Sequence, residues 1–166
     1  MTTFLIFLLA YTLSQFYRAF LAVIAPELAR DLSLTATDLG NMSALWFGSF
    51  ALAQFPVGWA LDRYGPRRTV PLIMLAAVVG SLLFSMARGR WDCMLAMILI
   101  GIGCAPIYMG ALYVFGRIYP AKQFALLSSW LIGIGSIGNL LSATPLAFAS
   151  EEIGWRATFA LIMGIT

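Results

Sequence analysis

Long apolar runs, broken only by short polar turns, dominate the sequence and limit the folds open to it. The first run extends from about Phe4 to Ala29, and four more of similar character follow. A helix needs roughly 20 apolar residues to cross the hydrocarbon core of a bilayer. Charged residues make up only 10% of the chain, whereas soluble domains carry about 25%. The sequence therefore predicts an all-α integral membrane protein.

We expect five full transmembrane helices and part of a sixth, forming one N-terminal helical bundle over residues 1–166. Their approximate ranges are 4–29, 39–61, 69–87, 93–115, 124–149 and, for the partial helix, 157–166. A helix over the last range would rise about 15 Å, half of a ~30 Å hydrocarbon core. We therefore interpret the chain as a fragment. A natural half-length protein acting as a homodimer is the alternative, because such folds arise from repeats.

The absence of histidine narrows the possible chemistry. Together with the lack of paired carboxylates inside the expected spans, it argues against an intramembrane hydrolase. We accordingly expect no enzyme activity, no cofactor and no structural metal site. The net charge of +3 comes without a basic run, so the sequence does not indicate a nucleic-acid partner. We expect membrane lipid to surround the protein.

The turn between the second and third spans carries the strongest local motif. It runs from Gly58 to Arg68 as GWALDRYGPRR. Gly58 would allow close approach to a neighbouring helix, and Gly65-Pro66 is typical of a tight turn. Asp62 is an acceptor with three arginines near it. A generic charged hairpin with arginines on the inner side is the alternative interpretation.

The motif resembles the signature of the major facilitator superfamily at all six defining positions: Gly58, Asp62, Arg63, Gly65, Arg67 and Arg68. The resemblance implies a cytoplasmic loop in a fold of two six-helix bundles, with substrate bound near the midplane and alternating access by rocking. It also implies that this loop latches the N-terminal bundle to the C-terminal six-helix half. Gly154-Trp155-Arg156 similarly resembles the family's usual start of helix six.

Arg18 lies near the middle of the first expected span, where a charge costs at least a few kcal/mol. Tyr11, Ser14 and Gln15 precede it by seven, four and three residues, so the four side chains share one helical face. This polar face must meet protein or water rather than lipid. A structural arginine bonded to neighbouring carbonyls is one interpretation, and a fixed cation in a substrate cavity is the other.

The segment from Arg18 to Pro26 is similar to the first helix of the anion:cation symporters and organophosphate antiporters of that superfamily. The resemblance implies that this arginine contacts the phosphate or carboxylate of the substrate. A planar, permanently charged guanidinium suits that task. We therefore predict a secondary transporter for a small organic or inorganic anion, with Tyr11, Ser14 and Gln15 beside Arg18 in the binding site.

One face of the fourth span could complete the cavity; it comprises Met97, Gly101, Cys104 and Tyr108. We add Tyr108 to the predicted substrate site. Met97 stands where many proton-coupled members of the family carry an arginine, so a proton-coupling role at this position is in doubt. The coupling ion, H⁺ or Na⁺, stays open; a proton carrier would be Glu27, Asp38 or a residue in the C-terminal half.

Two other functions stay open. Cys93, Met94 and Met97 cluster on the fourth span and could pass a soft metal ion such as Cu(I). The same bundle could also serve as a non-transporting receptor or assembly subunit, because fold does not fix function. Basic residues in the loops, five on one side against four on the other, slightly favour a cytoplasmic N-terminus in a bacterial-type inner or plasma membrane.

Overall fold

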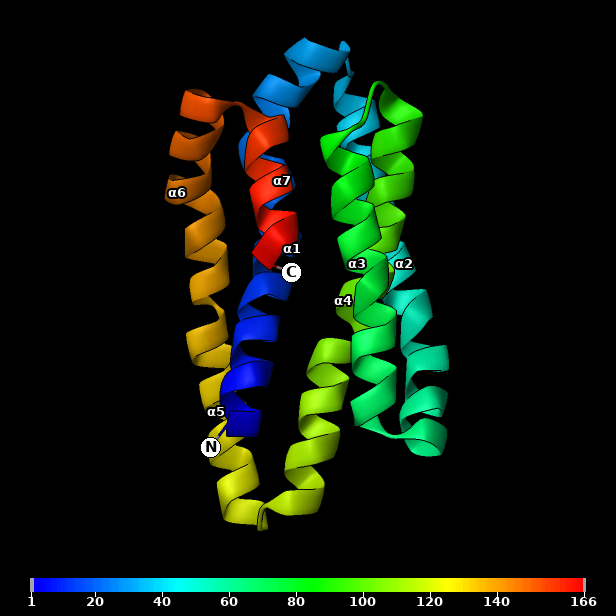
Figure 1. The fold of residues 1–166 in the computed structure, drawn as a ribbon, viewed down its shortest axis with the longest axis vertical. Helices are drawn as coiled ribbons and strands as arrows, with labels where there is room; N and C mark the ends of the chain where they lie inside the picture. The colour runs from blue at the N-terminus through cyan, green and yellow to red at the C-terminus, as the bar shows by residue number, and fades with distance from the viewer. Residues whose placement is uncertain (1, 166) are drawn as a thin grey trace.

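The computed structural model describes residues 2–165, except for the side chains at 2, 144, 145, 147, 149–153, 160, 163 and 165. Over these residues the chain is helical and contains no strand (Figure 1). In chain order the helices are α1 (Thr2–Leu32), α2 (Ala36–Tyr64), α3 (Pro66–Ser85), α4 (Arg90–Ile118), α5 (Ala121–Gly135), α6 (Ile137–Ile153) and α7 (Trp155–Ile165). Successive long helices run in opposite directions, and short turns join them.

Five segments of this bundle are long and apolar enough to cross a membrane: Thr3–Leu32, Ala36–Tyr64, Pro66–Ser85, Arg90–Ile118 and Ala121–Ala143. A helix of 29 residues rises about 44 Å, which exceeds a ~30 Å hydrocarbon core. The expected all-α membrane bundle is thus confirmed. The expected partial helix at 157–166 corresponds to α7, although residue 166 lies outside the described residues.

Local sequence signals set the ends of α2. At its start, Thr35 and Asp38 form a capping box: the Thr35 Oγ1 accepts from the Asp38 backbone N–H at 3.2 Å, and the Thr35 N–H donates to the Asp38 carboxylate at 3.0 Å. At its end, Gly65 adopts φ 75° and ψ 164°, a conformation open mainly to glycine. Pro66 then supplies the first residue of α3. The tight turn expected at Gly65-Pro66 is confirmed.

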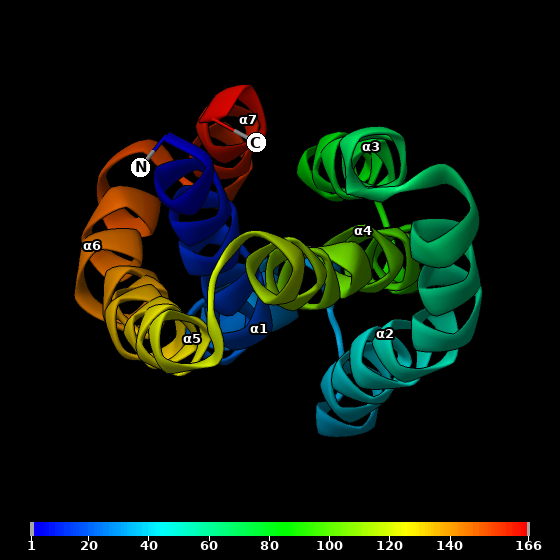
Figure 2. The ribbon, with the colours of Figure 1, turned by 90° about the horizontal axis from the view of Figure 1, so that it is seen from below.

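Helix α4 occupies the centre of the bundle, between α2 and α3, and its end reaches α5 (Figure 2). Its own apolar side chains lie on every face of the helix and many of them are buried, as expected of a helix packed among others. Glycines make the close approaches possible. A Cβ at Gly101 would come within 2.5 Å of the Trp46 carbonyl oxygen on α2, and one at Gly103 within 2.8 Å of Ala77 Cα on α3.

The fifth predicted span, 124–149, is divided by a turn at Ser136 into α5 and α6, which continue in nearly the same direction (Figure 1). The Ser136 hydroxyl donates to the Ile132 carbonyl at 2.8 Å, an interaction that bends helices, and nearby glycines weaken the helix further. Gly138 lies against α1, since a Cβ there would sit 2.9 Å from the Thr12 carbonyl carbon. The sequence did not predict this turn, but the membrane-length segment Ala121–Ala143 continues across it.

A polar network ties the start of α7 to two other helix ends. The Trp155 indole N–H donates to the Asp31 carboxylate at 2.8 Å, and Arg156 lies 3.4 Å from the same oxygen. Arg156 also donates to the Ala87 carbonyl in the α3–α4 turn at 3.1 Å. The Trp155-Arg156 pair, singled out as a family-like helix start, therefore joins α7 to the end of α1 and to that turn.

Candidate functional site

Arg18 projects from the middle of α1 with an exposed side chain. Its guanidinium carbon lies 5.6 Å from the ring centroid of Trp46 and 5.5 Å from that of Phe50, both on α2. Within the described part of the chain, the guanidinium makes no hydrogen bond and no ion pair. No carbonyl among these residues accepts a hydrogen bond from the guanidinium, so the N–H groups of Arg18 are available to a partner from elsewhere.

Three other predicted site residues come together where α1 meets α4 and α5. The Gln15 side-chain amide donates to the Tyr11 hydroxyl at 3.0 Å, and both side chains are buried. The Tyr11 and Tyr108 rings have centroids 5.5 Å apart, with Tyr108 only partly buried. Gly135 on α5 closes over Tyr11, since a Cβ there would overlap the tyrosine ring. Tyr11, Gln15 and Tyr108 therefore form one packed polar cluster that extends from α1 to α4.

Ser14 is also buried, at 4% exposure, on the same helix. The expected cavity-lining face of α4 is only partly realised. Met97 and Cys104 are each 2% exposed, and Gly101 packs against α2. These three residues fill helix contacts because α4 is the central helix, and only Tyr108 of that face keeps partial exposure. The expectation that the other three line a cavity was wrong.

The charged residues of the α2–α3 turn all lie on the surface: Asp62, Arg63, Arg67 and Arg68. None of them forms an ion pair within the described residues. The Arg63 guanidinium carbon instead lies 5.7 Å from the Trp59 ring centroid. Below the turn, the Thr69 hydroxyl donates to the Ala60 carbonyl at 3.0 Å and joins α3 to α2. The turn is thus held firmly while its charges remain exposed.

Gly58 does not have the role expected from its sequence. A Cβ at this position would meet only the Met109 methyl group, at an ordinary contact distance of 3.6 Å. Larger residues therefore fit at this point of the described bundle, and close helix approach is provided by Gly101 and Gly103 instead. Within the described bundle, α2 meets α4 closely at a different level, so the close approach predicted at Gly58 is not found between these helices.

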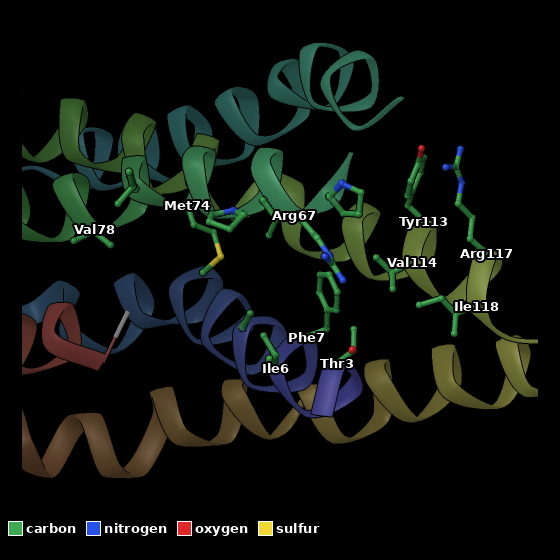
Figure 3. A pocket seen from close by; sticks show the side chains of 15 residues that line it. Thr3, Ile6, Phe7, Arg67, Met74, Val78, Tyr113, Val114, Arg117 and Ile118 are labelled. Carbon is green, nitrogen blue, oxygen red and sulfur yellow. The ribbon is translucent and has the colours of Figure 1, made fainter. Parts of the chain in front are cut away.

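A groove of about 740 Å³ lies between α1, α3 and α4, near the α2–α3 turn (Figure 3). Its lining is mostly apolar, with Arg67, Tyr113 and Arg117 at one end. The Arg117 guanidinium carbon sits 4.2 Å from the Tyr113 ring centroid. The groove includes Arg67 of the motif but none of the five predicted substrate-binding residues. It is distinct from the surroundings of Arg18.

Sequence reasoning missed Trp46 and Phe50 as neighbours of Arg18. Both were ordinary aromatic residues of an apolar span. The only available signal was the general tendency of arginine to stack on aromatic rings. Which rings stand beside a given arginine depends on how α1 and α2 pack, and this could not be deduced from the spacing of residues on one helix.

Five helices of membrane length define an integral, multi-pass membrane protein. Residues 7–166 match the Major Facilitator Superfamily, and the chain belongs to that family of transporters.

Several transporters are similar to the chain. It is 28% identical to the uncharacterized transporter YybO of Bacillus subtilis (strain 168) over 90% of its length, and 26% identical to the hexuronate transporter of that species over 93%. It is 29% identical to the 4-hydroxybenzoate transporter PcaK of Pseudomonas putida over 71%. The chain covers 34%, 37% and 27% of these three proteins respectively, about a third of their length.

Proposed function

We propose that this chain is the N-terminal half of a secondary active transporter that moves a small organic or inorganic anion by alternating access. The proposal rests chiefly on Arg18. A charge in the middle of a membrane helix costs at least a few kcal/mol, yet this one is exposed and unpaired by any described residue. A transported anion that binds Arg18 and then leaves would explain why a permanently charged side chain has no partner among the described residues.

The relatives give independent support for the class of cargo. Their names specify hexuronate, 4-hydroxybenzoate and nitrate or nitrite. Each of these solutes is an oxyanion at neutral pH, and two of them are carboxylates. Planar oxyanions match the paired N–H donors along the edge of a guanidinium. We infer that the cargo of this protein belongs to the same chemical group.

The remaining site residues have supporting roles in this proposal. Tyr11, Gln15 and Tyr108 form the polar wall beside the anion, and Ser14 adds a hydroxyl on the same face of α1. Small shifts of α1 against α4 would expose or cover this wall as the two halves rock. In this proposal the coupling ion that drives transport is H⁺ or Na⁺.

The α2–α3 turn is the latch in this proposal. Asp62, Arg63, Arg67 and Arg68 are exposed without ion pairs in the described bundle, which leaves them available to the C-terminal six-helix half. We place this turn and the N-terminus on the cytoplasmic side of a bacterial-type inner membrane. A charged latch of this kind would favour the state in which the cytoplasmic ends of the two halves are together.

Uptake into proteoliposomes by the intact transporter tests the proposal. The solutes are radiolabelled glucuronate, 4-hydroxybenzoate, nitrate and phosphate, with glucose as the neutral control and Cu(I) as the soft-metal control. Two charge-assisted hydrogen bonds are worth about 3–6 kcal/mol together, so Arg18→Ala should lower kcat/KM for the transported anion by a factor of about 10²–10⁴. Arg30→Ala, on an exposed arginine at the end of α1, is the matched control and should transport normally.

The contrary outcomes are distinct. Anion uptake by Arg18→Ala at the wild-type rate would refute the role of Arg18 as the anion site. Copper uptake without anion uptake would favour the soft-metal function. Wild-type protein that binds an anion without moving it would identify a receptor rather than a transporter.

A further inference from the structure

We infer that Trp46 and Phe50 are positioning residues that hold the Arg18 guanidinium for the anion, an inference that rests on the proposed function. Their rings are nearly parallel, with planes 7° apart and centroids separated by 5.4 Å. Arg18 Cζ lies 5.6 Å and 5.5 Å from the two centroids. The three groups therefore form an almost equilateral triangle that links α2 to the middle of α1.

The aromatic pair is fixed more firmly than the arginine. Trp46 is 1% exposed and Phe50 is partly buried, whereas Arg18 is exposed. Behind Trp46, the Ser49 hydroxyl donates to the Trp46 carbonyl at 3.0 Å, and Gly101 allows α4 to pack directly against that carbonyl. The rings thus form a rigid surface, and the flexible arginine side chain rests on it.

The indole N–H of Trp46 argues that core packing alone does not explain a tryptophan at this position. The Nε1 atom is buried and has no hydrogen-bond partner among the described residues. A buried donor without a partner destabilises the fold, and phenylalanine at this position would avoid that cost. Indole is, however, the best aromatic partner for a cation. The attraction to Arg18 gives a physical reason for tryptophan at this position.

The consequence concerns how the anion is recognised. A free arginine side chain has many rotamers, and binding of a solute would otherwise have to overcome the loss of that freedom. Rings that attract the guanidinium restrict it before the solute arrives and leave N–H groups at its edge for two oxygens of a planar anion. A cation–π interaction is worth roughly 0.5–2 kcal/mol, so losing one ring should weaken anion binding about 2- to 30-fold.

The test measures transport kinetics of ring variants in proteoliposomes of the intact transporter, with whichever of glucuronate, 4-hydroxybenzoate or nitrate the wild type carries. Phe50→Leu should raise KM about 2- to 30-fold with kcat nearly unchanged, and Phe50→Tyr should keep the wild-type KM. Trp46→Phe should raise KM less. Phe47→Leu is the matched control, because Phe47 contacts Trp46 but makes no cation–π contact with Arg18.

An unchanged KM in Phe50→Leu and Trp46→Phe, with Arg18→Ala inactive, would overturn the positioning role and leave the proposed function standing. A KM raised equally by Phe47→Leu would also overturn it, since general packing would then be the cause. Failure of the proposed function has a different signature: no anion uptake by the wild type, or normal uptake by Arg18→Ala. If Phe50→Leu does not fold, Trp46→Phe decides the question alone.

Discussion

Replacing Gly103 by alanine should strain the closest contact between α3 and α4. The added Cβ would overlap the Ala77 backbone nitrogen and come within 2.5 Å of Ala77 Cβ and 2.8 Å of Ala77 Cα. Ala77 is 2% exposed in the middle of α3, so neither a rotamer change nor a side-chain shift can relieve the overlap. The two helix axes must move apart.

The size of the effect follows from this geometry. Forcing a methyl group into a packed contact costs about 1–3 kcal/mol, and overlap with backbone atoms places Gly103→Ala near the upper end, at about 3 kcal/mol. Alanine also favours the helix by up to ~1 kcal/mol relative to glycine. Gly48→Ala on α2 and Gly133→Ala on α5 are controls for this gain in helix stability, because a Cβ at either position meets no atom within 4 Å.

The assay is reversible unfolding of the intact transporter in detergent micelles with increasing sodium dodecyl sulfate, followed by tryptophan fluorescence. Gly103→Ala should have a free energy of unfolding about 2–3 kcal/mol below that of Gly48→Ala and Gly133→Ala. Adding Ala77→Gly should recover only part of the loss, since the backbone overlap remains. Equal stability of Gly103→Ala and the two controls would refute the assignment of this contact as the closest between α3 and α4.

Three further predictions use the same unfolding assay. Gly65→Ala should lower the free energy of unfolding by about 1–3 kcal/mol, because φ 75° with ψ 164° is strained for any residue with a Cβ; an unchanged value would contradict this account of the turn. Thr69→Val should cost about 1 kcal/mol by removing the donor to the Ala60 carbonyl, whereas Thr69→Ser should behave as wild type; equal losses would point to packing instead. Trp155→Phe should cost about 1 kcal/mol by removing the bond to Asp31, which is half exposed, and should have no effect when Asp31 is already alanine; additive losses would contradict the pairing.

The parts of the fold that were predictable depend on local chemistry. Apolar runs of membrane length require helices because backbone groups in lipid must bond within their own segment, and Gly65-Pro66 allows few conformations other than a turn. The mid-helix place of Arg18 follows from the same runs. These features needed no knowledge of which helices touch.

The features that escaped prediction depend on packing between helices. The burial of Met97 and Cys104 follows from the central place of α4, which no single-helix pattern specifies. The aromatic neighbours of Arg18 come from another helix. The turn at Ser136 combines a serine bond to a carbonyl with poor helix formers, a pattern that many continuous helices tolerate. Pairwise helix geometry, rather than composition, decides all three.

The network around Trp155 has a consequence for biosynthesis. Asp31 and Trp155 are 124 positions apart in the chain, and Arg156 and Ala87 are 69 apart. A ribosome delivers residues in order, so α1 and the α3–α4 turn enter the bilayer long before their partners on α7 exist. Until α7 inserts, Asp31 lacks both donors, and the five membrane-length segments before α7 are joined only by their own contacts. Docking of α7 therefore closes this network only after all the other described helices have been made.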